Sequence, residues 1–79
     1  MGEFNLGERI LYYLDIKQMS QKEFAKLCNV TESTMTRYIK GEREPKCTTL
    51  MNMAYVLGVS LDDLTNYNSY LIQKYTKEL

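Results

Sequence analysis

Residues 21–40 read QKEFAKLCNVTESTMTRYIK, and the rest of the chain is expected to be organised around this stretch. Apolar side chains recur at helical spacing on both sides of a short corner. The positions expected to face a common core are Phe24, Leu27, Cys28, Met35, Tyr38 and Ile39. The pattern therefore predicts two short amphipathic helices that meet at Val30.

The polar and small residues around this corner have mechanical roles. Ser20 followed by Glu23 forms the pattern of a capping box, and Thr31 is a candidate N-cap for the second helix. Asn29 lies at the turn, where a positive φ is expected and where Asn is tolerated better than a branched residue. Ala25 is small enough to let another helix approach closely. Together these features indicate a helix-turn-helix.

Three further helices are expected around this pair. A helix over residues 6–17 precedes it, and a helix over about residues 48–57 follows a polar connector. Gly41 and Gly58 are expected to end helices in the left-handed conformation. The apolar positions expected in the core are Ile10, Leu11, Tyr13, Leu14, Leu50, Met53, Ala54 and Leu57.

The last helix is expected to begin after Ser60, which Asp63 would help to cap. Its apolar and aromatic pattern could continue to the end of the chain through Leu61, Leu64, Tyr67, Leu71, Tyr75 and Leu79. Such a stripe must be covered. It either folds back on the first helix or forms a two-fold seam with a second copy, for which the candidates are Tyr67, Leu71 and Tyr75.

The order and spacing of these features resemble the lambda-repressor-like helix-turn-helix family (the XRE family) of phage and bacterial regulators. The matching positions are Ser20, Gln21, Phe24, Ala25, Val30, Thr31, Ser33, Thr34, Arg37, Gly41, Pro45, Leu50, Ala54, Leu57, Gly58, Val59, Ser60, Leu61 and Leu64. The chain departs from the family pattern at Asn29, where glycine is usual, and at Ile39, where an acidic residue is frequent. Lys46 also replaces a common Ser or Thr cap.

The resemblance implies an all-α fold, namely a compact five-helix lambda-repressor-like DNA-binding domain with an extended C-terminal helix. Its helix-turn-helix would be formed by the second and third helices. The expected divisions are a flexible lead over residues 1–5, the DNA-binding domain over 6–66 and a C-terminal extension over 67–79 that packs or dimerises.

The composition restricts the classes of protein to which this chain can belong. A chain of 79 residues with 44% hydrophobic residues can form one small core. No apolar run approaches the ~20 residues needed to span a membrane. Two cysteines without a CxxC spacing, and no histidine, argue against a metal site and fit a reduced, cytoplasmic protein. No cofactor is expected.

The formal net charge is zero, but the charges are unevenly distributed. Residues 1–16 carry −2, residues 17–46 carry +3 and residues 47–79 carry −1. The basic excess coincides with the helix-turn-helix and the connector after it, which favours a side that faces phosphates. A solvated charged face is the alternative interpretation.

In the family that this chain resembles, the second helix crosses the DNA backbone and the third enters the major groove. The resemblance therefore assigns base contacts to Glu32, Ser33 and Thr36. Arg37 is a further candidate base contact, or else a phosphate clamp. Candidate phosphate contacts, which position a protein without reading sequence, are Ser20, Gln21, Lys22, Lys40, Arg43 and Lys46. Alternatively, Lys22 and Arg43 are ordinary surface charges, Glu32 pairs with a cation, and Gln21 only supports the helix start.

Two functions follow from this sequence. The first is a sequence-specific transcriptional regulator that binds double-stranded DNA, as a homodimer on a two-fold operator. The second is a protein-interaction module of the same fold with weak or no DNA binding, which the zero net charge and the tyrosine-rich end favour. An enzyme is not expected, because no nucleophile and base, and no glycine-rich phosphate loop, can be assembled from these residues.

Overall fold

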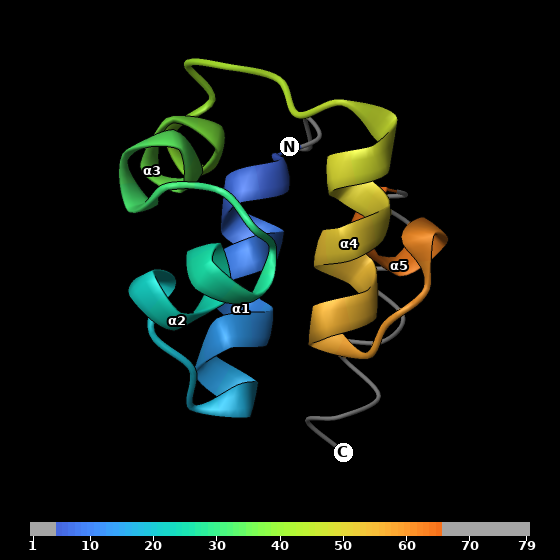
Figure 1. Cartoon of the computed structure of the whole chain (residues 1–79). Helices are drawn as coiled ribbons and strands as arrows, with labels where there is room; N and C mark the ends of the chain where they lie inside the picture. Colours follow the sequence, from blue (N-terminus) through green and yellow to red (C-terminus); the bar gives the residue numbers. More distant parts are fainter. Residues whose placement is uncertain (1–4, 66–79) are drawn as a thin grey trace.

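The computed structural model describes residues 5–65, which form five α-helices and no β-strand within that range (Figure 1). The helices are α1 (Leu6–Lys17), α2 (Gln21–Leu27), α3 (Glu32–Lys40), α4 (Cys47–Leu57) and α5 (Leu61–Thr65). The predicted order of helices is confirmed, and α4 begins one residue earlier than expected. The expected lead, apart from Asn5, and the expected extension of the last helix lie outside the described residues.

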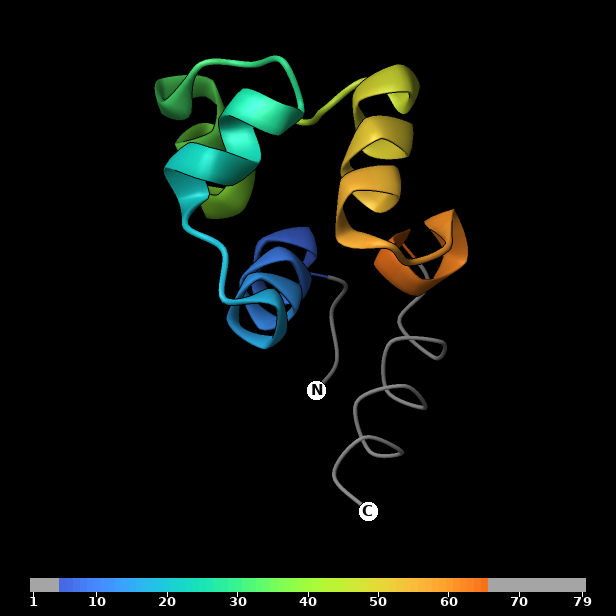
Figure 2. The ribbon, with the colours of Figure 1, turned by 60° about the horizontal axis from the view of Figure 1, so that its bottom comes forward.

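Helix α1 lies between two pairs of helices. It packs against α3, α4 and α5, while α2 packs against α3 and α4. Figures 1 and 2 show α2 and α3 grouped on one side of the molecule and α4 and α5 grouped on the other. The helix-turn-helix formed by α2 and α3 is therefore supported by two other helices, α1 packing against α3 and α4 packing against α2.

The core takes side chains from every described helix. The buried apolar residues are Ile10, Tyr13, Leu14, Phe24, Ala25, Cys28, Met35, Tyr38, Met53, Ala54, Leu57 and Leu64. Each large one contributes about 1.5–3 kcal/mol by leaving water. Most of the expected core positions are confirmed, and Ile39 and Leu50 pack against this core while only partly buried.

The prediction of a core position is wrong for two residues. Leu11 is 43% exposed and Leu27 is 59% exposed. On α1 the buried face is centred on Arg9, Ile10 and Tyr13, so Leu11 lies at its solvent edge. On α2 the buried residues are Phe24 and Ala25 with Cys28 after them, which rotates the face away from Leu27.

Arg9 is only 1% exposed, although no pattern in the sequence marks this charged residue as part of the core. Its Nη1 donates a hydrogen bond of 3.1 Å to the backbone carbonyl of Leu64. Tyr13 donates its hydroxyl proton to the carbonyl of Asp63 at 3.4 Å. Two polar side chains of α1 therefore hold α5, from 50 and 55 residues away in the sequence, through a neutral and a charge-assisted hydrogen bond to its backbone.

The helix ends follow the predicted capping chemistry. Ser20 and Glu23 form a reciprocal capping box, with hydrogen bonds of 3.0 and 3.3 Å. Ser60 and Asp63 make the same reciprocal pair at α5. Asn29 has φ +62°, as expected, and Gln18 at the end of α1 has φ +56°, which the sequence did not indicate. These caps satisfy backbone groups that would otherwise be unpaired at the helix ends.

Helix α1 and the end of α3 approach each other closely at Gly7. Gly7 is buried on α1, and a Cβ atom at this position would overlap the backbone carbonyl of Ile39. The overlapped atoms belong to the backbone, so no side chain can rotate away to make room. Only glycine allows α1 and α3 to lie at this separation.

We expect Gly7→Ala to destabilise the domain by about 1–3 kcal/mol through overpacking. The sign is informative, because at an open helix position the same change stabilises a helix by up to about 1 kcal/mol. Urea denaturation followed by circular dichroism measures the effect. Glu8→Ala, at an exposed neighbouring position, serves as the control and should change stability much less. An unchanged or increased stability of Gly7→Ala would contradict the described packing of α1 on α3.

Candidate nucleic-acid interface

Helix α3 has two chemically different faces. Met35 and Tyr38 are buried on the inner face, at 0% and 7% exposure. The residues exposed on the other face are Glu32, Ser33, Arg37 and Lys40. Every one of them is polar, and together they present hydrogen-bond donors and acceptors on a helix whose apolar side is fixed in the core.

The corner before α3 fixes how this polar face is presented. The backbone amide of Asn29 bonds to the carbonyl of Lys26 at 3.1 Å, and that of Val30 bonds to the carbonyl of Ala25 at 3.0 Å. Thr31 then accepts a hydrogen bond of 3.1 Å from the amide of Thr34. The corner thus has its own hydrogen bonds at both ends, so α3 starts at a defined angle to α2.

Thr36 differs from the other predicted base contacts. It is half-buried, and its hydroxyl donates a hydrogen bond of 3.0 Å to the backbone carbonyl of Glu32. The hydroxyl proton is therefore occupied within the helix. What Thr36 can still present to a ligand is its methyl group and a hydroxyl lone pair.

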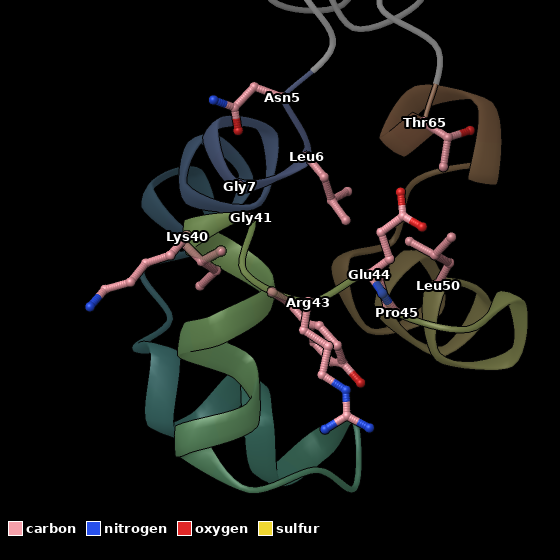
Figure 3. A pocket seen from close by; sticks show the side chains of 12 residues that line it. Asn5, Leu6, Gly7, Lys40, Gly41, Arg43, Glu44, Pro45, Leu50 and Thr65 are labelled. Atoms are coloured by element: carbon pink, nitrogen blue, oxygen red, sulfur yellow. The ribbon is translucent and has the colours of Figure 1, made fainter.

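The end of α3 carries cations on both of its sides. Gly41 has φ +78°, and the amide of Glu42 bonds back to the carbonyl of Arg37 at 2.9 Å, which turns the chain sharply out of the helix. Figure 3 shows Lys40 extending to one side of α3, whereas Arg43 extends along the other side. The exposed face of α3 is therefore flanked by a positive charge on each side.

The structure separates the predicted phosphate contacts into groups. Ser20 and Gln21 line a shallow depression beside α1, together with Asp15. Lys22 and Arg43 line a concave surface at the α2–α3 corner. Lys46 is the N-cap of α4, where it makes no side-chain capping bond.

A groove of about 610 Å³ opens between the start of α1, the end of α3 and the connector to α4 (Figure 3). Lys40 and Arg43 lie along it, and Leu6, Ile39 and Leu50 supply its apolar part. Within residues 5–65, no group of three or more His, Cys, Asp or Glu side chains is placed to hold a metal ion. The helices of the same range are all too short or too polar to cross a membrane.

A protein-family model described as helix-turn-helix matches residues 10–64. The chain belongs to the lambda-repressor-like helix-turn-helix family. The match includes the whole of α2, α3 and the connector after them, and therefore all of the predicted contact residues.

A curated relative of this helix-turn-helix chain is an uncharacterized HTH-type transcriptional regulator of Haemophilus influenzae, 45% identical over 58 residues. The aligned region is 73% of this chain, and the chain spans only 24% of the length of that relative. The P22 c2 repressor in complex with a synthetic operator has a similar fold, with a TM-score of 0.74, 23% identity and coverage of 82% of this chain and 97% of that chain.

The N-terminal DNA-binding domain of SinR from Bacillus subtilis is also similar, at 28% identity. Its TM-score is 0.69, and the match covers 75% of this chain and 87% of that chain. These likenesses confirm the predicted fold and family. The individual contact residues predicted from the sequence stay predictions, and the dimerisation candidates Tyr67, Leu71 and Tyr75 lie outside the described residues.

One exposed cation of this surface was absent from the predicted contacts. Lys26 lies one helical turn after Lys22 on α2 and lines the same concave surface at the corner. The i, i+4 spacing of the two lysines was the available sequence signal. This signal is weak, because a pair of lysines on the polar side of a short helix is common on any protein surface.

The two cysteines of the chain differ in environment. Cys28 is 2% exposed at the end of α2, and burial raises the pKa of its thiol to about 11. Cys47 is exposed at the start of α4. Because the thiolate is the reactive form, Cys28 should behave as a packed apolar side chain.

We therefore expect an aromatic disulfide reagent at pH 8 to label one thiol per folded chain rapidly and the second only after unfolding in urea. The Cys47→Ser variant should lose the rapid phase and keep the slow one. Equal rates for both thiols in the folded wild-type chain would show that Cys28 is not held in the core as described.

Proposed function

We propose that this chain is the sequence-specific DNA-binding unit of a transcriptional regulator, and that it acts by placing α3 in the major groove of double-stranded DNA. The observation that carries the proposal is the division of α3 into a buried apolar face and an exposed polar face flanked by Lys40 and Arg43. A major groove admits an α-helix and lies between two rows of phosphates, so it matches a polar helix with a cation on each side. SinR, whose DNA-binding domain is 28% identical, has also been seen in complex with DNA.

Each exposed residue of α3 has a specific chemical capacity in such a complex. Glu32 can only accept hydrogen bonds, so it would favour cytosine, whose N4 amino group is a donor in the groove. Arg37 can donate two hydrogen bonds to the O6 and N7 atoms of guanine. Ser33 is less selective, and Thr36 would present its methyl group to thymine, because its hydroxyl proton is bonded within the helix.

The remaining predicted contacts would hold the domain on the DNA backbone. Lys22, Lys40, Arg43 and Lys46 can neutralise phosphates, and Ser20 and Gln21 can donate hydrogen bonds beside them. Such contacts set the orientation of α3 and make binding dependent on salt concentration. They carry no sequence information of their own.

We further propose that the regulator binds as a homodimer. A domain of zero net charge neutralises few phosphates, so a single copy should bind weakly. Two copies related by a two-fold axis would place two α3 helices about 34 Å apart, which is one turn of DNA. The residues proposed for the seam are Tyr67, Leu71 and Tyr75, in the segment that follows α5.

A second candidate function is a protein-interaction module of the same fold. It is favoured by the exposed apolar side chains of α4, since Met51 is 55% and Tyr55 is 87% exposed. Helix α4 also has no charged residue along its length. Neither candidate function requires a catalytic group or a cofactor. For the first candidate, a DNA-binding regulator of phage or bacterial type, the place of action would be the cytoplasm, where its DNA lies.

The test begins with selection of DNA sequences that the wild-type chain binds, followed by anisotropy titrations. Arg37→Ala should lose about 1–3 kcal/mol of discrimination at one base pair of the selected site. Lys46→Ala should instead weaken matched and mismatched sites by the same factor. The contrast arises because a base contact carries sequence information and a phosphate contact does not.

Lys17→Ala is the matched control, because it also removes one positive charge. Lys17 lies in the last turn of α1, whereas α3 packs against the first turn of α1, at Gly7. This variant should leave affinity and specificity unchanged. If Arg37→Ala and Lys46→Ala both bind like the wild type, the face assigned to DNA is wrong. If the wild-type chain selects no sequence at low salt, the protein-interaction function stands instead.

A further inference from the structure

A concave surface lies at the helix-turn-helix corner, between α2 and the start of α3, and has a volume of about 660 Å³. We call it the corner dish. Its cationic residues are Lys22, Lys26 and Arg43, which come from two separate segments of the chain. Arg43 reaches it from the connector after α3, by extending back along that helix (Figure 3).

The charge of the corner dish is unbalanced. Three cations line it against one carboxylate, that of Glu32. All three cationic side chains are exposed, and none of them makes an ion pair within the described residues 5–65. Exposed cations gathered around a hollow attract an anion more strongly than the same charges spread over a convex surface.

The side chains on the floor of the corner dish are small. Ala25 is 1% exposed and Val30 packs against the core, so no bulky side chain fills the hollow. The hydroxyls of Thr31 and Thr34 are bonded to each other at 2.8 Å. Thr31 is the donor of this bond, so the hydroxyl proton of Thr34 is still available. The groups left to donate to a ligand are therefore the three cations, the hydroxyl of Thr34 and the side chain of Asn29, which is exposed at the turn.

The corner dish is continuous with the surface assigned to DNA. Glu32 lines the dish and is also the first residue of α3, among the proposed base contacts. Arg43 lines both the dish and the groove that carries Lys40. A strand of DNA that borders the groove entered by α3 would therefore pass beside these cations.

We propose that the corner dish seats backbone phosphates of one DNA strand, and that Lys26 is a phosphate-binding residue together with Lys22 and Arg43. The inference rests on the proposed function and extends it to one more residue and to a defined seat for the backbone. Charge complementarity and continuity with the α3 surface select DNA as the occupant. An acidic segment of a partner protein is the competing occupant.

The test is the salt dependence of binding by Lys26→Ala to a duplex selected by the wild-type chain. Removing one phosphate contact should reduce the slope of log K against log salt concentration by about 0.9. Affinity should fall by the same factor for matched and mismatched duplexes, because the contact reads no base. Lys26→Arg should restore the slope, whereas Lys17→Ala should leave it at the wild-type value.

Lys26 is exposed, so these variants should fold normally, and circular dichroism checks that they do. A wild-type slope for Lys26→Ala, with selected DNA still bound, would overturn the corner dish as a phosphate seat and leave the proposed function intact. Binding of a polyglutamate peptide by wild type but not by Lys26→Ala, with unchanged DNA binding, would assign the dish to an acidic protein partner instead. Failure of the wild-type chain to bind any duplex would overturn the proposed function itself.

Discussion

The packing of α3 on α1 fixes the orientation of the surface that is proposed to bind DNA. Gly7 lets the two backbones approach at Ile39, and Met35 and Tyr38 bury the inner face of α3. A helix fixed along one side can only present the other side to a ligand. The corner at Asn29 and the turn at Gly41 then define where this presented face begins and ends.

The packing of the helices determines which charges of the chain lie near the surface that is proposed to bind DNA. A net charge of zero describes the whole chain, whereas a ligand meets only one surface of it. The cations near that surface come from α2, from the end of α3 and from the connector, and they line two hollows that share Arg43. Meanwhile Arg9 is removed from the surface, because its guanidinium is buried against α5. Local arrangement, more than total charge, therefore decides whether such a domain can bind DNA.

Much of the fold could be predicted from the sequence, because its signals are local. The capping pairs at Ser20 and Ser60 and the positive φ of Asn29 each depend on a few neighbouring residues. Leu11 was assigned to the core wrongly, since helical periodicity alone does not fix the rotation of a helix to within one residue. Arg9 was missed because its partner, the carbonyl of Leu64, is distant in sequence. For the same reason the corner dish was not foreseen: it needs Arg43 to fold back beside Lys22 and Lys26.

In the proposed function, the outward face of α3 contacts DNA while its inward face stays in the core. Backbone amide shifts in a ¹H–¹⁵N spectrum, followed during titration with a selected duplex, distinguish this face from the other surfaces of the domain. We expect the largest shifts over residues 31–43 and small ones along the outward side of α4, at Met51 and Tyr55. Large shifts on α4 with an undisturbed α3 would contradict it.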